Sequence, residues 1–470
     1  MSEPALKRSD VVFMYKADDE AYRAYGATFV GWGGAMDADE VRRHHDVGVR
    51  CAGNMWTLTA GAKLLHDDPE QMAATARDIQ GEPVEVPWLQ DHTYRGTRTY
   101  FGCTNHPTFR ALNRQQVRKV LAGGPDGLHV DDHLGAANAA VNFGGGFCDH
   151  CMAGFREYLA RHSDAEELAT AGVRTVEGFD YRDVVRALAP TREQYLKTRR
   201  SIPLMNRFEQ FHVEAAAENF RQLGELASEV TGHDMLLSGN ACLPHWPHTY
   251  AVRHMTHVIC EVAQRAGEGT ARPEEALLAY RAAEAMGKPL AATAHGGDWA
   301  YVKAHEVHEL VRYWIALAYA HGQRFMVPHP TRQWALSWEH GTHWYAAPID
   351  EFAPVYRFVR ANAERFDGYA AAETQPQAQE GVIASLRIRA GGPAVMHLVN
   401  RDYDRRRDAM RPSADVTVRV PTAELPSDVP AEATVLSWDA DPQRASVRRA
   451  GETVEVTVPE LRLWSVVVLG

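Results

Sequence analysis

Eight short apolar runs, separated by stretches with helical spacing of apolar residues, constrain the fold of this chain more than any other feature. Such alternation is typical of repeated βα units that build a parallel sheet. The predicted strands are Thr28–Trp32, Val49–Asn54, Thr99–Cys103, Gly127–Asp131, Met235–Gly239, His257–Glu261, Leu290–Ala294 and Arg324–Pro328. We therefore expect an α/β fold of the (β/α)8 TIM-barrel type, because eight parallel strands close on themselves.

The period of the apolar pattern changes after a polar segment, Glu373–Glu380. From Gly381 onward apolar and polar residues alternate, as in Val382–Ile388 and Val454–Val458, which is the pattern of half-buried strands. This pattern predicts a small antiparallel β-sandwich. We therefore predict a barrel domain over residues 1–372 and a C-terminal β-sandwich domain over residues 381–470.

The composition of the chain indicates which classes of partner and which cellular compartment to expect. Its 470 residues carry a formal net charge of −11. A nucleic-acid partner is not expected, because binding a polyanion needs a basic face. No segment approaches the roughly 18 apolar residues of a membrane span, and the first residues lack the apolar core of a signal peptide. We expect a cytoplasmic protein with no membrane partner, whose sandwich could contribute contacts to a homo-oligomer.

Two carboxylates end predicted strands: Asp131 ends the fourth and Glu261 ends the sixth. Barrel enzymes keep their catalytic groups at this end of the strands. Asp131 shares its parity along the strand with His129, so we expect Asp131 to face the barrel mouth and Asp132 to orient one of the pair. The structural alternatives are an Asp131 that caps the following loop and a Glu261 paired with an arginine. Glycoside cleavage needs such a pair: one carboxyl protonates the leaving oxygen, and the other acts as nucleophile or activates water.

Polar and aromatic side chains follow the other strand ends. Sugar hydroxyls need hydrogen-bonding partners, and sugar ring faces stack on tryptophan. The predicted carbohydrate-binding residues are Trp32, Asn54, Trp56, Asn105, His106, His133, Asn240, His295, Asp298, Trp299 and His329. Tryptophans also fill protein cores, and Trp314 is the clearest example that we assign to packing.

Cys148 and Cys151 have the Cys-x-x-Cys spacing of a metal chelate, and Cys103 ends an earlier predicted strand. Three thiolates leave one position of tetrahedral zinc open, so a structural zinc here needs a fourth ligand such as His150. The other histidines scatter singly, without a His-Glu-x-x-His pair. We expect no cofactor to be required for catalysis.

The segment Asn142–Leu159 resembles the region after the fourth strand in the β-galactosidases of glycoside hydrolase family 42. In that family a cysteine-rich loop precedes a helix that starts in Phe-Arg, and the loop often binds zinc. Cys103, Cys148 and Cys151 match three of the family's cysteines, whereas Gly146 stands where the family usually has a fourth.

Two further segments, Cys103–Pro107 and Asp126–Asp131, look more like a broader group of glycosidase-like barrels in which Asp-Gly-Ile-x-x-Asp ends the fourth strand. The acid/base of family 42 is an Asn-Glu pair on that strand, and this chain has Asp131 and Asp132 instead. The resemblance therefore implies a glycosidase-type barrel without galactosidase specificity.

These observations together predict a glycoside hydrolase that acts on a small or terminal carbohydrate, with Asp131 and Glu261 as the carboxyl pair. A carboxyl separation of about 5 Å would indicate retention and one of roughly 6.5–9.5 Å inversion. Two alternatives stay open. One is a non-catalytic carbohydrate-binding barrel in which the carboxyls are structural. The other is a metal-dependent lyase or isomerase with His133, His295 and His329 around an ion.

Overall fold

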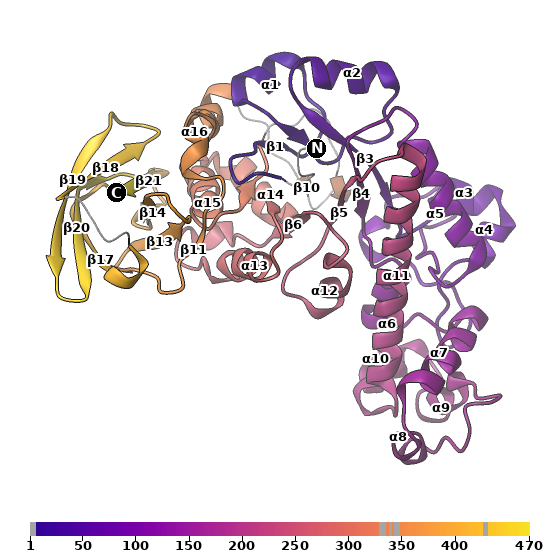
Figure 1. Ribbon diagram of the computed structural model, residues 1–470. Helices are drawn as coiled ribbons and strands as arrows, with labels where there is room; N and C mark the ends of the chain where they lie inside the picture. The colour runs from indigo at the N-terminus through magenta and orange to yellow at the C-terminus, as the bar shows by residue number, and fades with distance from the viewer. Residues whose placement is uncertain (1–5, 329–334, 338–340, 343–347, 426–430) are drawn as a thin grey trace.

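The computed structural model contains a barrel of parallel strands followed by an antiparallel sheet (Figure 1). It describes residues 6–328, 335–337, 341–342, 348–425 and 431–470. The barrel strands are β1 (Val12–Phe13), β2 (Phe29–Val30), β3 (Arg50–Trp56), β4 (Gly127–Asp131), β5 (Leu236–Gly239), β6 (Val258–Val262), β7 (Leu290–Ala294) and β8 (Arg324–Phe325). The predicted TIM-barrel fold is confirmed.

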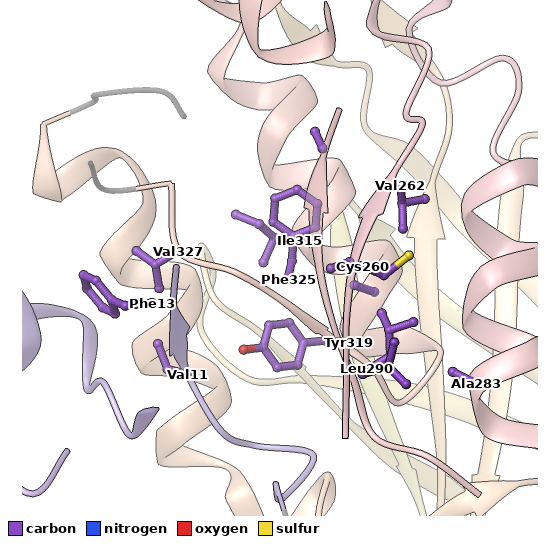
Figure 2. Packing of buried hydrophobic residues seen from close by; sticks show 14 of the residues in the cluster. Val11, Phe13, Cys260, Val262, Ala283, Leu290, Ile315, Tyr319, Phe325 and Val327 are labelled. Atoms are coloured by element: carbon purple, nitrogen blue, oxygen red, sulfur yellow. The ribbon is translucent and has the colours of Figure 1, made fainter. Parts of the chain in front are cut away.

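Backbone pairing closes the barrel where its two parallel sheets meet. Asn240 pairs with Ile259 between β5 and β6, and Phe13 pairs with Val327 between β1 and the residues after β8. Figure 2 shows Val11 and Phe13 beside Val327 at this second seam. Closure leaves no unpaired strand edge, and it sets the carboxyl ends of all the strands around one mouth.

One predicted barrel strand is wrong. The run Thr99–Cys103 lies in the long connection from β3 to β4, where Gly102 and Tyr100 form antiparallel bridges with Thr75 and Glu85. The missing barrel strand is β1, whose two residues are too few to give a periodic signal. An apolar run therefore predicted extended backbone correctly but not the sheet to which that backbone belongs.

Helices that follow the strands cover the outside of the barrel (Figure 1). They are α1 (Asp19–Tyr25), α2 (Ala38–Asp46), α3 (Ala62–Asp67), α4 (Pro69–Ala73), α5 (Pro107–Val120), α12 (Trp246–Val252), α13 (Glu274–Ala285), α14 (Gly296–His305), α15 (His308–Ala320) and α16 (Ile349–Ala361). The side chains of Asp18 and Asp37 accept backbone N–H groups in the first turns of α1 and α2, which fixes where these helices begin. Trp314 on α15 is fully buried, as predicted.

A helical insertion, residues 132–235, separates β4 from β5. It contains α6 (Ala136–Asn142), α7 (Asp149–His162), α8 (Ala165–Thr170), α9 (Tyr181–Leu188), α10 (Arg192–Thr198) and α11 (Met205–Thr231). The insertion has a core of its own, in which Phe147 and Phe208 stack with ring centroids 5.0 Å apart and Phe155 packs edge-on against Phe208. In Figure 1, α11 runs from the far end of the insertion back to the barrel.

The chain ends in one antiparallel sheet that curls around its own core, so the predicted sandwich is confirmed. Its strands, in sheet order, are β11 (Ala370–Ala371), β13 (Val382–Ile388), β14 (Ala394–Asn400), β21 (Trp464–Leu469), β18 (Glu432–Ser437), β19 (Gln443–Ala450), β20 (Thr453–Leu461), β17 (Ser413–Pro421) and β12 (Gln377–Ala378). Alternate side chains of these strands, among them Val418 and Val456, meet in a single buried cluster. The predicted linker Glu373–Glu380 is not wholly irregular, because it contributes β12.

Two short hairpins complete the description: β9 (Ala335–Ser337) with β10 (Gly341–Thr342), and β15 (Tyr403–Asp404) with β16 (Ala409–Met410). Arg387 of β13 is buried against the barrel, where it forms an ion pair with Glu284 of α13. The domain limits 1–372 and 381–470 stay a prediction. Among the described helices, none combines the length and apolarity that crossing a membrane requires.

Candidate active site

The inward-facing side chains of β4 line the interior of the barrel up to its mouth. His129 is fully buried, with its Nδ1 2.9 Å from the hydroxyl of Ser238 on the neighbouring strand. Leu128 and Val130 point the other way, into the apolar core between barrel and helices. Asp131 has the parity of His129, so its side chain lies on the barrel side of β4, as the strand pattern predicts.

The side-chain amide of the residue directly after β5 hydrogen-bonds with a carboxyl of β4 and a carboxyl of β6. Nδ2 of Asn240 donates a hydrogen bond to Oε1 of Glu261 over 3.1 Å. The Asn240 side chain also hydrogen-bonds with Asp131. The structure therefore brings together three residues that the sequence assigned to the site from three separate strand ends.

Asp132 has a left-handed backbone, with φ of 47°, directly after β4. This conformation turns its N–H back onto Oδ1 of Asp131 at 3.0 Å. Its carbonyl accepts the Thr57 hydroxyl at 2.9 Å and the Gly135 N–H at 2.9 Å. Left-handed backbone is unfavourable for a residue with a Cβ, so these bonds hold a strained turn that orients Asp131. Asp132 therefore contacts Asp131 through its backbone.

The carboxyls at the mouth are electrostatically coupled. Burial and the charge of Glu261 raise the pKa of Asp131 to about 6, although hydrogen bonds from Asn240, from the Asp132 N–H and from Trp32 oppose the rise. Burial, followed by the charges of Asp131 and Glu261, raises the pKa of Asp132 well above its usual range. Burial and neighbouring charge thus disfavour the ionised forms of Asp131 and Asp132, so the mouth can hold a proton and a carboxylate together.

Three of the predicted sugar-binding residues lie on the barrel side of β2 and β3. Trp32, just after β2, contacts His129 edge-on with ring centroids 4.4 Å apart and hydrogen-bonds with Asp131. Trp56 is opposite Asp131 in the β3–β4 register and is partly exposed. Asn54 accepts the N–H of Gly34 at 2.6 Å, so its Oδ1 supports the loop after β2.

Trp299 is buried by packing, which corrects its predicted place in the sugar pocket, whereas the place of the half-buried Asp298 there stays a prediction. Trp299 is 2% exposed and packs against Trp314, while its indole N–H donates to Thr293. The Asp298 carboxylate accepts the backbone N–H groups of Gln264 and Ala266 at 2.8 and 2.7 Å. Asp298 thereby holds the turn that follows Glu261.

Asn105 and His106 lie at the cysteine loop and at the start of α5, whereas the ring of His133 lies beside Gly239 at the end of β5. Asn105 donates to the sulfur of Cys151, and His106 caps α5 through the N–H of Thr108. His133 is 1% exposed and lies with its ring against Phe220 of α11 and His248 of α12. His133 follows β4 as the sequence predicts, but the sequence could not show that its ring would be buried against α11 and α12.

His295 is exposed at the N-terminus of α14, after β7, and its sugar-binding role stays a prediction. His329 lies outside the described residues. The metal-enzyme alternative needed His133, His295 and His329 around one ion, and the burial of His133 between α11 and α12 argues against that arrangement.

The structure brings the three predicted cysteines together. Sulfur atoms of Cys103, Cys148 and Cys151 lie 3.3–3.4 Å from one another, inside the protein. Tetrahedral ligands about 2.3 Å from zinc would lie about 3.8 Å apart, so the three sulfurs are close to a zinc-binding arrangement. His150, the predicted fourth ligand, is exposed, and its ring lies against His106. The cluster joins the β3–β4 connection to the start of α7 in the helical insertion, outside the carboxyl site.

Sequence reasoning missed several residues that shape the mouth. Ser238 contacts His129, Thr57 holds the Asp132 turn, and Tyr15 lies beside Trp32 with ring centroids 6.4 Å apart. Ser238 has the same strand parity as Asn240, which was the available signal. Tyr15 follows the two-residue strand β1, so it could not be recognised as a strand-end residue.

No family model matches the chain. Two curated relatives are named alpha-agarase. The one from Thalassotalea agarivorans is 24% identical over 399 residues, which cover 78% of this chain and 26% of the relative. The one from Alteromonas agarilytica is 23% identical over 299 residues, which cover 62% of this chain and 20% of the relative. The chain thus spans about a quarter or less of the length of these relatives.

Among solved structures, the cycloisomaltooligosaccharide glucanotransferase of Paenibacillus sp. is similar over its whole architecture. Its TM-score is 0.62 at 9% identity, and the match covers 98% of this chain and 85% of that one. At this identity the similarity concerns the fold, a TIM barrel with a C-terminal antiparallel sheet. The solved structure supports the barrel fold predicted from the sequence, and none of these comparisons singles out family 42.

Proposed function

We propose that this chain is a glycoside hydrolase that cleaves an α-linked galactan of the agarose type, with Asp131 and Glu261 as its carboxyl pair. The observation that carries the proposal is the joining of these two carboxyls by the Asn240 amide at the barrel mouth. The two relatives named alpha-agarase support the substrate class. The family 42 resemblance contributes the cysteine loop to this picture and no galactosidase activity.

The hydrogen bonds of Asp131 suit this carboxyl to one of the two roles. Asp131 accepts from the Asp132 N–H and is hydrogen-bonded by the side chains of Asn240 and Trp32. Donors of this kind favour the ionised form and fix its direction. We therefore assign Asp131 as the carboxylate that attacks the anomeric carbon or activates water for that attack, and Glu261 as the acid that protonates the leaving oxygen.

The surrounding aromatic side chains suit a sugar ring. Trp32 and Trp56 lie on the two strands before β4, on the barrel side, and Trp56 keeps part of its ring exposed. A partly exposed indole beside carboxylates provides a stacking face for a pyranose and leaves the hydroxyls to the polar groups. In this assignment Asn54 positions the loop that carries Trp32.

The test is digestion of agarose, agaro-oligosaccharides and a panel of other α- and β-linked oligosaccharides by the wild type, Asp131→Asn and Glu261→Gln. Both variants are expected to lose at least about 1,000-fold in kcat, because each removes a group that acts in the transition state. Glu268→Gln is the matched control, since Glu268 follows the same strand but pairs with Arg272 on the surface.

Leaving-group dependence separates the two roles. Glu261→Gln should regain activity on aryl glycosides with acidic leaving groups, which need no protonation, whereas Asp131→Asn should not. Cleavage of a galactan by wild type that is unchanged in either variant would overturn the assignment of that carboxyl. Failure to cleave any glycoside on the panel would instead favour the carbohydrate-binding barrel.

A further inference from the structure

A cavity of about 490 Å³ lies where the C-terminal sheet meets the barrel. Three segments that are distant in the sequence supply its walls: the connection from β6 to α13, the residues just before β13, and the chain around β15. The lining residues used below are Thr270, Ala271, Glu380, Gly381, Arg401, Tyr403 and Arg405. The described lining does not include Asp131, Asn240 or Glu261, so this cavity is separate from the carboxyl site.

Hydrogen bonds between the three segments hold the walls of the cavity in place. The hydroxyl of Thr270 donates to the Arg401 carbonyl at 2.6 Å, and the Arg401 guanidinium donates to the carbonyls of Thr270 and Ala271 at 3.2 and 2.8 Å. The backbone N–H of Arg401 donates to the Gly381 carbonyl at 2.8 Å. The cavity is therefore built before any ligand arrives, as small-molecule sites usually are.

Two arginines that line the cavity have no carboxylate partner in the described part of the chain. Arg401 uses Nε and Nη2 for the two backbone carbonyls, and Arg405 donates from Nη2 to the Tyr301 hydroxyl at 3.4 Å. A guanidinium carries five N–H donors and keeps its charge at any physiological pH. Each side chain thus has donors and a positive charge left for a ligand.

The carboxylates nearby do not cancel this charge. Glu268, which also lines the cavity, is already paired with Arg265 and Arg272. Glu380 is the remaining carboxylate of the described lining, and it is exposed. The exposed run Arg405–Arg407 continues the positive charge on the surface beside the cavity, in a chain whose net charge is −11. This local excess of positive charge favours an anionic ligand.

Tyr403 adds an aromatic surface in a fixed orientation. Its hydroxyl donates to Asp408 at 2.7 Å. Its ring packs on the backbone of Gly269, where a Cβ would lie 3.1 Å from a ring carbon. The ring is partly exposed and lines the cavity. Sugar rings stack on such aromatic faces, while guanidinium groups bind sulfate and carboxylate oxygens in pairs.

We propose that this cavity binds an anionic saccharide unit, with a sulfate ester or carboxylate on Arg401 and Arg405 and the sugar ring on Tyr403. That the unit belongs to a galactan rests on the proposed function. A polysaccharide held here and at the barrel mouth at the same time would stay on the enzyme between cleavages, because the second contact becomes intramolecular.

The first test is calorimetric titration of the full chain, as Glu261→Gln to prevent cleavage, with a sulfated galactan tetrasaccharide and with the same tetrasaccharide after desulfation. The sulfated form is expected to bind at least 10-fold more tightly in 50 mM salt, and the difference should shrink in 500 mM salt. Equal affinities would overturn the anionic ligand. A single-stranded RNA of equal charge that binds more tightly than the sulfated tetrasaccharide would overturn the saccharide.

Variants show whether binding occurs in this cavity. Arg405→Gln should weaken binding of the sulfated tetrasaccharide at least 5-fold, whereas Glu380→Gln should strengthen it about 2-fold, because it removes a repelling carboxylate. Arg449→Gln is the matched control, since Arg449 is an exposed arginine of β19 that also has no carboxylate partner among the described residues. Unchanged affinity in folded Arg405→Gln would contradict the site.

Two further readouts keep this test independent of folding defects and of the proposed function. If circular dichroism shows that Arg405→Gln is unfolded, Glu380→Gln decides, and unchanged or weaker binding by it would contradict the site. Wild type that cleaves no glycoside would overturn the proposed hydrolase, whereas the loss of binding in Arg405→Gln would still establish the cavity as a saccharide site.

Discussion

Asn240 holds Glu261 from the neighbouring strand through a hydrogen bond of 3.1 Å, and the same amide reaches Asp131 on the other side. One side chain on β5 therefore sets the positions of the carboxyls on β4 and β6. Catalysis depends on such positions to within fractions of an ångström. In the proposed reaction Asn240 would act as a positioning residue, whose loss should weaken the reaction without removing either carboxyl.

Asn240→Ala is expected to lower kcat about 100-fold on the substrate that the wild type cleaves, similar to the loss of one preorganised donor elsewhere. Because the Asn240 hydrogen bond lowers the pKa of Asp131, its removal should also move the acidic limb of kcat/KM to higher pH. The pH profile of kcat/KM measures both effects. Asn142→Ala, an exposed amide bonded to Asn138, serves as the control, and an unmoved acidic limb in Asn240→Ala would contradict the role.

Asp131 is expected to reduce the stability of the fold at neutral pH. Burial and then Glu261 raise its pKa from 3.8 to about 6, so the folded state binds this proton more tightly than the unfolded state does. The wild type should therefore gain stability as pH falls from about 6 toward 4. Asp131→Asn, which carries no charge, should be more stable than the wild type by about 1–3 kcal/mol at pH 7.5, with the advantage disappearing near pH 4.

Thermal or denaturant unfolding at both pH values checks this prediction, with the unfolding slope compared between proteins. Asp149→Asn is a suitable control, because Asp149 is an exposed carboxylate that pairs with Arg182. It should shift stability by less than about 1 kcal/mol. If Asp131→Asn is no more stable than the wild type at pH 7.5, the environment of Asp131 does not disfavour its charge as the structure indicates.

Strand parity accounts for the part of the site that could be predicted from the sequence. His129 with Asp131 and Ser238 with Asn240 are spaced by two, so each pair shares a face of its strand. The barrel follows from the same alternating pattern, although β1 was too short to recognise. Contacts between side chains of different strands, such as the hydrogen bond from Asn240 to Glu261, leave no local pattern in the sequence.

Residues beyond a strand end could not be assigned in this way. Trp299 and Asp298 lie on α14, where the direction of a side chain depends on how the helix packs against the barrel.

Substitutions at two tryptophans distinguish a role in core packing from a role in the proposed site. Trp299→Ala should lower the free energy of unfolding by about 3–5 kcal/mol, because it removes a fully buried indole. Trp32→Phe keeps an aromatic ring but removes the N–H that hydrogen-bonds with Asp131, so it should lower kcat at least 10-fold with a much smaller loss of stability. Denaturant unfolding and steady-state kinetics on both variants test the contrast. A folded, stable Trp299→Ala with altered KM would instead return Trp299 to the sugar site.

Glu284 on α13 fastens the C-terminal sheet to the barrel by pairing with Arg387, which is 2% exposed, and with Arg8. Burial opposes its ionisation, but Arg387 and Arg8 hold the pKa of Glu284 below its usual range, so its contribution to stability should be present above about pH 4.5 and lost in more acidic solution. Glu284→Ala leaves a buried guanidinium without its carboxylate and should cost about 3–5 kcal/mol at pH 7.

Glu275 on the same helix supplies the matched comparison, because it pairs with Arg265 at the surface. Glu275→Ala should change the free energy of unfolding by less than about 1 kcal/mol. Urea unfolding at pH 7 and pH 3.5 distinguishes the two positions, since the difference between Glu284→Ala and the wild type should shrink in acid. Equal, small effects of both substitutions would mean that apolar packing, rather than this buried ion pair, holds the sheet on the barrel.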